Sequence, residues 1–270
     1  MRAVPNGIDA SLEMMPVQPV TPGSSLPSGL YLFFAPGDRP DTDAIASLID
    51  GVDNTPLSAQ ISHRPAGEAG WLELLASGLT FDLIGLRPGE GGRMMDAAQS
   101  FGFTDAAMPE AFEVVELVPS GHIVSGAGLV PILRTMMNLA ANLVLELPVL
   151  AVGWGPAQTR MEPAYFCRSV LNWLGGGPFP ALGLTGLVRA EDGSVTSRGL
   201  THFMGQEIQL QGLRGESAAD SVKIAMRVID QLVRRGRIDA PMKIDAGGQT
   251  LLAEPSQIGR LVLLWRENDG

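Results

Sequence analysis

Short apolar runs alternate with amphipathic helical patterns along most of the chain. Residues 30–35 form an apolar run that ends at Pro36 and Gly37, which predicts a buried strand. Apolar residues at helical spacing predict helices over residues 42–51, 129–146, 162–174 and 218–235. Other apolar runs predict strands over residues 57–63, 79–86, 112–118, 122–125, 149–153, 184–190, 194–203, 207–211, 249–253 and 260–265. Residues 71–77 fit a helix and a strand equally well.

Local signals in the second half of the chain define a hairpin and a helix. Asp192 and Gly193 lie between two apolar runs, and this pair is typical of a tight hairpin because it accepts positive φ angles. Ser217 and Asp220 resemble a capping box at a helix start, and Gly236 follows the last periodic position of that helix.

Strands mixed with helices and at least one hairpin predict an α+β fold. We expect a mixed or mainly antiparallel sheet with helices packed on one face. Residues 29–270 supply the globular part, either as one continuous unit or as two lobes with a boundary near residues 118–121. Residues 1–28 are rich in proline, which predicts an extended N-terminal arm.

Three blocks in the second half carry a family resemblance. They are residues 151–157 (AVGWGPA), Tyr165-Phe166 with residues 176–184 (GGPFPALGL), and residues 198–208 (RGLTHFMGQEI). In order and spacing they resemble a bacterial family known as domain of unknown function 4261, over about residues 120–270. The resemblance implies a compact bacterial α+β domain, and it brings no activity or catalytic residue that could be transferred.

Charge and composition exclude several classes of protein. The 270 residues carry a formal net charge of −10, which disfavours nucleic acid and anionic membranes as partners. Residues 129–152 are apolar, but Arg134, Asn138, Asn142 and Glu146 share one helical stripe, so we expect no membrane span. The one cysteine has no disulfide partner in the chain, and residues 1–28 lack the unbroken apolar stretch of a signal peptide. A cytoplasmic location follows as the expectation.

Two potential chemical sites have simpler structural interpretations. Cys167 lies on the same helical stripe as Val170 and Leu174, which favours a buried thiol over a nucleophile. Gly126 and Gly128 loosely resemble a dinucleotide-binding turn, but Pro131 replaces the third glycine, so tight packing of the backbone is favoured. We therefore expect no cofactor, and three histidines without a ligand spacing predict no metal site.

His202 and Glu207 are the best polar pair for chemistry. Together they could act as acid and base in a hydrolase-like cleft. Their separation of five residues puts them on opposite faces of a regular strand, unless Gly205 introduces a turn. A structural role for both is the alternative, so an enzyme is the second choice.

Large apolar residues in predicted loops are the other candidates. Trp154, Pro156, Phe179 and Pro180 follow predicted elements, where such side chains line a partner surface or cover the core. With no catalytic constellation beside them, the sequence favours a non-catalytic protein that binds another protein or its own copy through these residues. Binding of a small ligand in the same cleft is a further alternative.

Overall fold

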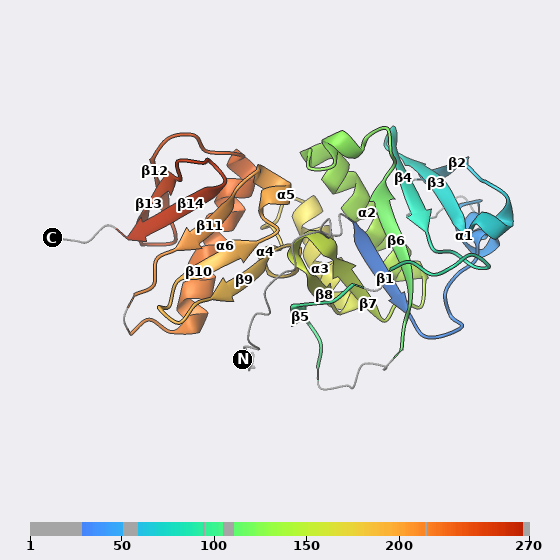
Figure 1. Ribbon diagram of the computed structural model, residues 1–270, viewed down its shortest axis with the longest axis horizontal. Coiled ribbons are helices and arrows are strands. Elements are labelled where there is room, and N and C mark those ends of the chain that lie inside the picture. The colour runs from blue at the N-terminus through green and yellow to red at the C-terminus, as the bar shows by residue number, and fades with distance from the viewer. Residues whose placement is uncertain (1–28, 51–58, 94, 105–110, 214, 267–270) are drawn as a thin grey trace, which may run out of the picture.

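The computed structural model describes residues 29–50, 59–93, 95–104, 111–213 and 215–266. These residues form two lobes that lie side by side, each built on its own sheet (Figure 1). Both sheets are mixed and carry packed helices, which confirms the predicted α+β class. The arm predicted over residues 1–28, and residues 57–58 of a predicted strand, lie outside the described residues.

The first lobe contains the larger sheet, in which eight strands are hydrogen-bonded side by side. In spatial order they are β2 (Ala59–His63), β3 (Trp71–Ala76), β4 (Leu79–Ile84), β6 (Glu113–Pro119), β1 (Leu30–Phe34), β7 (Ala151–Trp154), β8 (Thr159–Met161) and β5 (Gln99–Phe101). Neighbouring strands are antiparallel except β5 and β8, which run parallel. The ambiguous residues 71–77 therefore form a strand.

The central strand β1 is buried on both faces. Leu30, Leu32 and Phe34 belong to the main core, whereas Tyr31 and Phe33 belong to a smaller cluster on the opposite face of the sheet. A strand with two buried faces needs a continuous apolar run instead of alternation. This explains why residues 30–35 were recognisable in the sequence.

Three helices belong to the first lobe: α1 (Thr42–Asp50), α2 (Val130–Glu146) and α3 (Pro163–Leu174). α2 packs on β4 and β6, and α3 packs on α2 and β7. The apolar face of α2 is buried; it includes Leu133, Met136, Met137, Ala140 and Val144. Within the described residues, no helix is long and apolar enough to cross a membrane.

The second lobe contains a six-stranded sheet covered by one long helix, α6 (Ala218–Arg235). In spatial order the strands are β12 (Met242–Asp245), β13 (Thr250–Pro255), β14 (Leu261–Arg266), β11 (Glu207–Leu210), β10 (Val195–Arg198) and β9 (Gly186–Arg189). The predicted cap of α6 is present, since the Ser217 hydroxyl accepts a hydrogen bond from the Asp220 amide at 3.1 Å. β9 and β10 form the predicted hairpin through Gly193, which has a φ of 81°.

The structure corrects several expected elements. Residues 122–125 contain no strand, and the last two of them belong to a short 3₁₀ turn, η2 (Val124–Gly126). The strand expected over residues 194–203 ends at Arg198, and a one-turn helix, α5 (Thr201–Met204), follows Gly199. Gly199 has a φ of 83°, which breaks the extended backbone.

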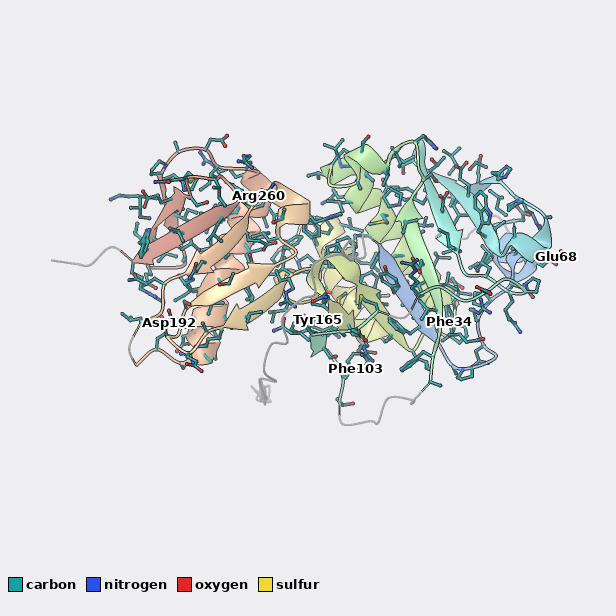
Figure 2. All side chains as sticks on the ribbon, viewed as in Figure 1. Phe34, Glu68, Phe103, Tyr165, Asp192 and Arg260 are labelled. Carbon is teal, nitrogen blue, oxygen red and sulfur yellow. The ribbon has the colours of Figure 1, made fainter. Side chains whose placement is uncertain are left out.

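The boundary between the two lobes lies later in the chain than the expected residues 118–121. All strands up to β8 belong to the first sheet, so residues 118–121 lie inside the first lobe. The chain crosses to the second sheet between β8 and β9, through α3 and a one-turn helix, α4 (Ala181–Leu184). Figure 2 shows Tyr165 of α3 at this junction, and its hydroxyl donates a hydrogen bond to the Leu182 carbonyl at 3.0 Å.

Polar contacts join the edges of the two sheets. The side-chain nitrogen of Gln99 in β5 donates a hydrogen bond to the backbone carbonyl of Leu187 in β9 at 2.7 Å. The side-chain oxygen of Gln99 accepts a hydrogen bond from the backbone N–H of Leu187 at 3.1 Å. Arg198 of β10 donates to the Gln158 side chain at 2.7 Å. A single main core also includes buried residues of both lobes. The lobes therefore share one packed interior.

Candidate binding groove between the lobes

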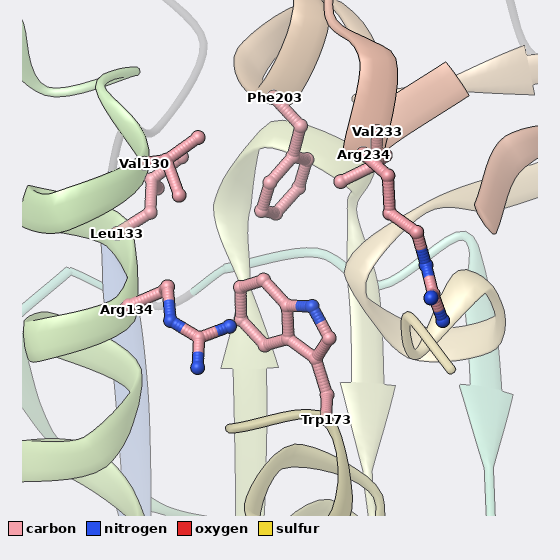
Figure 3. A pocket seen from close by; sticks show the side chains of 7 residues that line it. All are labelled: Val130, Leu133, Arg134, Trp173, Phe203, Val233 and Arg234. Atoms are coloured by element: carbon pink, nitrogen blue, oxygen red, sulfur yellow. The ribbon is translucent and has the colours of Figure 1, made fainter. Parts of the chain in front are cut away.

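An apolar groove of about 160 Å³ opens where the two lobes meet (Figure 3). Its lining comes from four helices and consists of Val130, Leu133 and Arg134 of α2, Trp173 of α3, Phe203 of α5, and Val233 and Arg234 of α6. In Figure 3 the α2 residues face Phe203 and Val233 across the groove, and Trp173 lies below them. Both lobes are therefore needed to form it.

The size of the groove limits what it holds. A cavity of about 150 Å³ with an aliphatic and aromatic lining holds one benzene molecule. The groove therefore has room for one ring or one leucine-sized side chain, whereas sites for larger ligands are typically about 300 Å³ or more.

Exposed apolar side chains lie at the start of α2 and just before it, and one of them, Val130, lines the groove. Leu129 is 61% exposed and Val130 is 48% exposed, and Val124 lies one short turn earlier with 52% exposure. We call Val130 and the adjacent Leu129 the lip of the groove. Such neighbouring exposed apolar residues are typical of a surface that a partner covers.

Gly128 attaches the lip to the second lobe. A Cβ atom at this position would lie 2.8 Å from the carbonyl oxygen of His202, which is closer than real Cβ atoms approach. The structural interpretation of this glycine, tight backbone packing, therefore agrees with the geometry. The contact places the loop before α2 directly against α5.

The large apolar residues predicted to form a binding surface lie behind the groove. Trp154 is fully buried and Phe179 is 4% exposed, and Pro156 and Pro180 are also buried. The expectation that these four side chains face a partner is therefore corrected: they fill the junction of the lobes. Their rings support Phe203, whose centroid lies 4.8 Å from that of Phe179 and 5.9 Å from that of Trp154.

His202 and Glu207 are not brought together as an acid–base pair. Both oxygens of the Glu207 carboxylate accept hydrogen bonds, which come from the Ser197 hydroxyl, the Leu200 amide at 3.2 Å and the Thr201 amide at 3.0 Å. Glu207 thereby caps the N-terminus of α5, and no hydrogen bond between it and His202 is found among the described residues. The hydrolase alternative gains no support from this geometry.

The His202 ring is enclosed by aromatic neighbours. It lies edge-on to Trp154 with 5.1 Å between centroids, and its Nε2 atom is buried without a hydrogen-bond partner in the described structure. Burial lowers the pKa of His202, because the charged imidazolium is poorly solvated there. His202 is therefore a packed, neutral ring at the lobe junction.

Two arginines border the groove and differ in their contacts. Arg234 forms an ion pair with Asp230 at 3.2 Å. Arg134 instead lies over the Trp173 ring, with 5.1 Å from its guanidinium carbon to the ring centroid, and donates to the Leu174 carbonyl at 2.7 Å. Within the described residues, no carboxylate forms an ion pair with Arg134.

The remaining candidates for chemistry are the Cys167 thiol and groups of side chains that could bind a metal. Cys167 is buried in α3, and burial together with the nearby Glu162 carboxylate raises the pKa of its thiol to about 11, which disfavours a thiolate nucleophile. In the part of the chain that the structure describes, no group of three or more His, Cys, Asp or Glu side chains could hold a metal ion.

Comparisons of the chain with protein-family models, with curated proteins and with solved structures found no match. The resemblance to domain of unknown function 4261 accordingly stays a prediction.

The sequence contained one unusual feature next to the groove. Leu129 occupies the N-cap position of α2, where its backbone is extended and its side chain makes no capping hydrogen bond. Helices favour Ser, Thr, Asp or Asn at this position, so an exposed leucine there is an anomaly that points to another role. Trp173 and Phe203 carried no such signal, because each was part of an ordinary apolar pattern.

Proposed function

We propose that this protein is a non-catalytic binding domain that holds one apolar side chain of another protein in the groove between its lobes. The observation that carries the proposal is the combination of a ring-sized apolar groove with the exposed lip of Leu129 and Val130. Protein interfaces commonly depend on a few anchor side chains that enter fully desolvated pockets.

A different protein fits better than a second copy of this chain. Each copy carries a net charge of −10, and like charge of this size opposes self-association over long distances. A monomer in sedimentation equilibrium at low salt is the expected result.

The test begins with peptides selected from a displayed random library on the immobilised full chain. Their affinities are then measured in solution by fluorescence polarisation against wild type, Leu129→Ser and Leu145→Ser. Leu145 is the matched control, because it is also an exposed leucine of the α2 segment, with 57% exposure, but lies at the other end of the helix, whereas Leu129 directly precedes Val130, which lines the groove. We expect Leu129→Ser to weaken binding about tenfold and Leu145→Ser to leave it unchanged.

Three results would contradict the proposal. The first is a selection that enriches no binder, and the second is equal affinity for wild type and Leu129→Ser. The third is a small molecule that native mass spectrometry finds retained on the chain and that competes with the peptides, because the groove would then be a ligand site.

A further inference from the structure

We infer that, in the absence of a partner, the groove is occupied by Met14 or Met15 of the chain's own N-terminal arm, which the partner must displace. The inference rests on the proposed function, because it concerns the same groove, and it adds the regulation of that site. It starts from the position of Gly29, the first described residue, and from the sequence that precedes it.

The chain enters the first lobe beside the groove. The Gly29 carbonyl accepts a hydrogen bond from the Gly155 amide at 3.1 Å, and the next residue, Leu30, is paired with Trp154. The ring of Trp154 lies 5.9 Å from the ring of Phe203, which lines the groove. Neighbouring strands lie about 5 Å apart, and together with the two rings this places Gly29 on the order of 15 Å from the groove.

The connection between the two methionines and Gly29 is long enough for this distance. Residues 16–28 form the connection. An extended chain covers about 3.3 Å per residue, so the connection spans up to about 40 Å. A tethered segment whose linker can span the distance to its site has an effective concentration on the order of 1 mM. The arm therefore competes strongly with a partner that is free in solution.

The groove suits a methionine side chain. It has room for one leucine-sized side chain, and methionine is close to leucine in size, since the two replace each other in protein cores at small cost. The rings of Trp173 and Phe203 form part of the lining (Figure 3). A thioether sulfur makes favourable contacts with aromatic rings, and the unbranched side chain adapts to irregular gaps.

Charge favours the chain's own arm over the arm of a second copy. The charged residues among residues 1–28 are Arg2, Asp9 and Glu13, so the arm contributes one excess negative charge to the net charge of −10. An arm from a second copy would bring the whole charge of that copy with it, and like charge of this size opposes the approach. We therefore expect the contact within one chain.

The first measurement needs no partner. The full chain is labelled with ¹³C in the methyl groups of methionine and valine, and nuclear Overhauser contacts are recorded by NMR. We expect contacts from Met14 or Met15 to the groove residues Val130 and Val233, with the same strength in dilute and concentrated samples. No such contact, or one that appears only at high concentration, would overturn the inference.

The second measurement uses the peptides selected on the wild-type chain. Full-length Met14→Ser/Met15→Ser should bind them about tenfold more tightly than wild type, as expected when the arm occupies the groove about 90% of the time. Leu26→Ser is the matched control. Only Pro27 and Ser28 separate Leu26 from Gly29, so Leu26 reaches about 10 Å from Gly29 at full extension and falls short of the groove. This control should bind the peptides as wild type does.

The outcomes distinguish the two proposals. Peptides that need Leu129 but bind wild type and Met14→Ser/Met15→Ser equally would overturn the inference and leave the proposed function standing. An equal gain in affinity for Leu26→Ser would also overturn the inference, because the effect would not be specific to the methionines. Methionine contacts in the groove, with no peptide selected on wild type or on the double variant, would support the inference and contradict the proposed function.

Discussion

The His202 imidazole shows how its neighbours decide what a polar residue can do. It lies edge-on to Trp154 and Phe203, and its own backbone carbonyl lies against Gly128 of the other lobe. Without a hydrogen-bonded carboxylate beside it, burial dominates and lowers its pKa. The sequence made His202 one member of the best polar pair for chemistry, whereas the structure gives it a packing role.

This environment predicts how stability depends on pH. In the unfolded chain His202 has a pKa of about 6.5, and because the folded pKa is lower, the unfolded state binds the proton more readily. The neutral ring of His202 therefore costs no folding free energy above the unfolded pKa of about 6.5. As the pH falls from that value toward the lower folded pKa, the unfolded state takes up the proton first and the free energy of unfolding decreases. Urea unfolding at about pH 7.5 and about pH 5.5 should show a smaller loss of stability for His202→Phe than for wild type.

The exposed His122 supplies the control for that measurement. His122→Phe should keep the wild-type loss of stability on acidification. If both variants show the wild-type loss, the desolvated state of His202 is contradicted.

At the scale of elements, the start of α2 has an unfavourable N-cap residue and lies next to the proposed binding groove. Leu129 leaves the N-terminal amides of the helix without a side-chain cap, although its extended backbone would suit a capping residue. An uncapped helix start with exposed leucine and valine is unfavourable for an isolated chain. The arrangement is consistent with a residue kept for contact with a partner.

Leu129→Ser should therefore change stability and binding in opposite directions. A serine at this N-cap is expected to raise the free energy of unfolding by about 0.5–1 kcal/mol, while peptide binding weakens. Urea denaturation of wild type, Leu129→Ser and Leu145→Ser measures the first effect. A lower free energy of unfolding for Leu129→Ser would show that Leu129 stabilises the fold. Its position at the N-cap would then no longer indicate a role in binding.

Elements with strong local signals were predictable, and elements that depend on distant pairing were not. α6 has its Ser217 cap, an amphipathic stripe and Gly236, all within one stretch of sequence. β5 and β8 have three residues each, which is too few for a recognisable alternation, and they pair across more than fifty residues of chain. Strand β12 at the sheet edge was missed for the same reason, since four residues carry little periodic signal.

At the scale of the whole molecule, the groove could not be predicted from the sequence, because it also depends on contacts between distant parts of the chain. Its lining residues come from α2, α3, α5 and α6, and only the docking of the lobes brings them together. From the sequence, Trp154 and Phe179 were expected either to line a partner surface or to cover the core. Their large rings were needed to fill the junction behind the groove, however, and not to contact a partner.

The joined lobes give the groove a defined shape. The Gln99 side chain connects the edges of the two sheets through hydrogen bonds with both the backbone N–H and the backbone carbonyl of Leu187, and the main core runs through both lobes. A site between such lobes is already formed before a partner arrives. Preformed sites bind with a smaller loss of conformational entropy than sites that must first be ordered.

The most direct test of the binding groove is methyl NMR spectroscopy of the full chain with a selected peptide. Val130 and Val233 face each other across the groove, whereas Val262 is fully buried in the sheet of the second lobe. We expect intermolecular contacts from the anchor side chain of the peptide to the methyl groups of Val130 and Val233, with Val262 unaffected. Contacts to other surface methyl groups, with those two valines unchanged, would contradict the account.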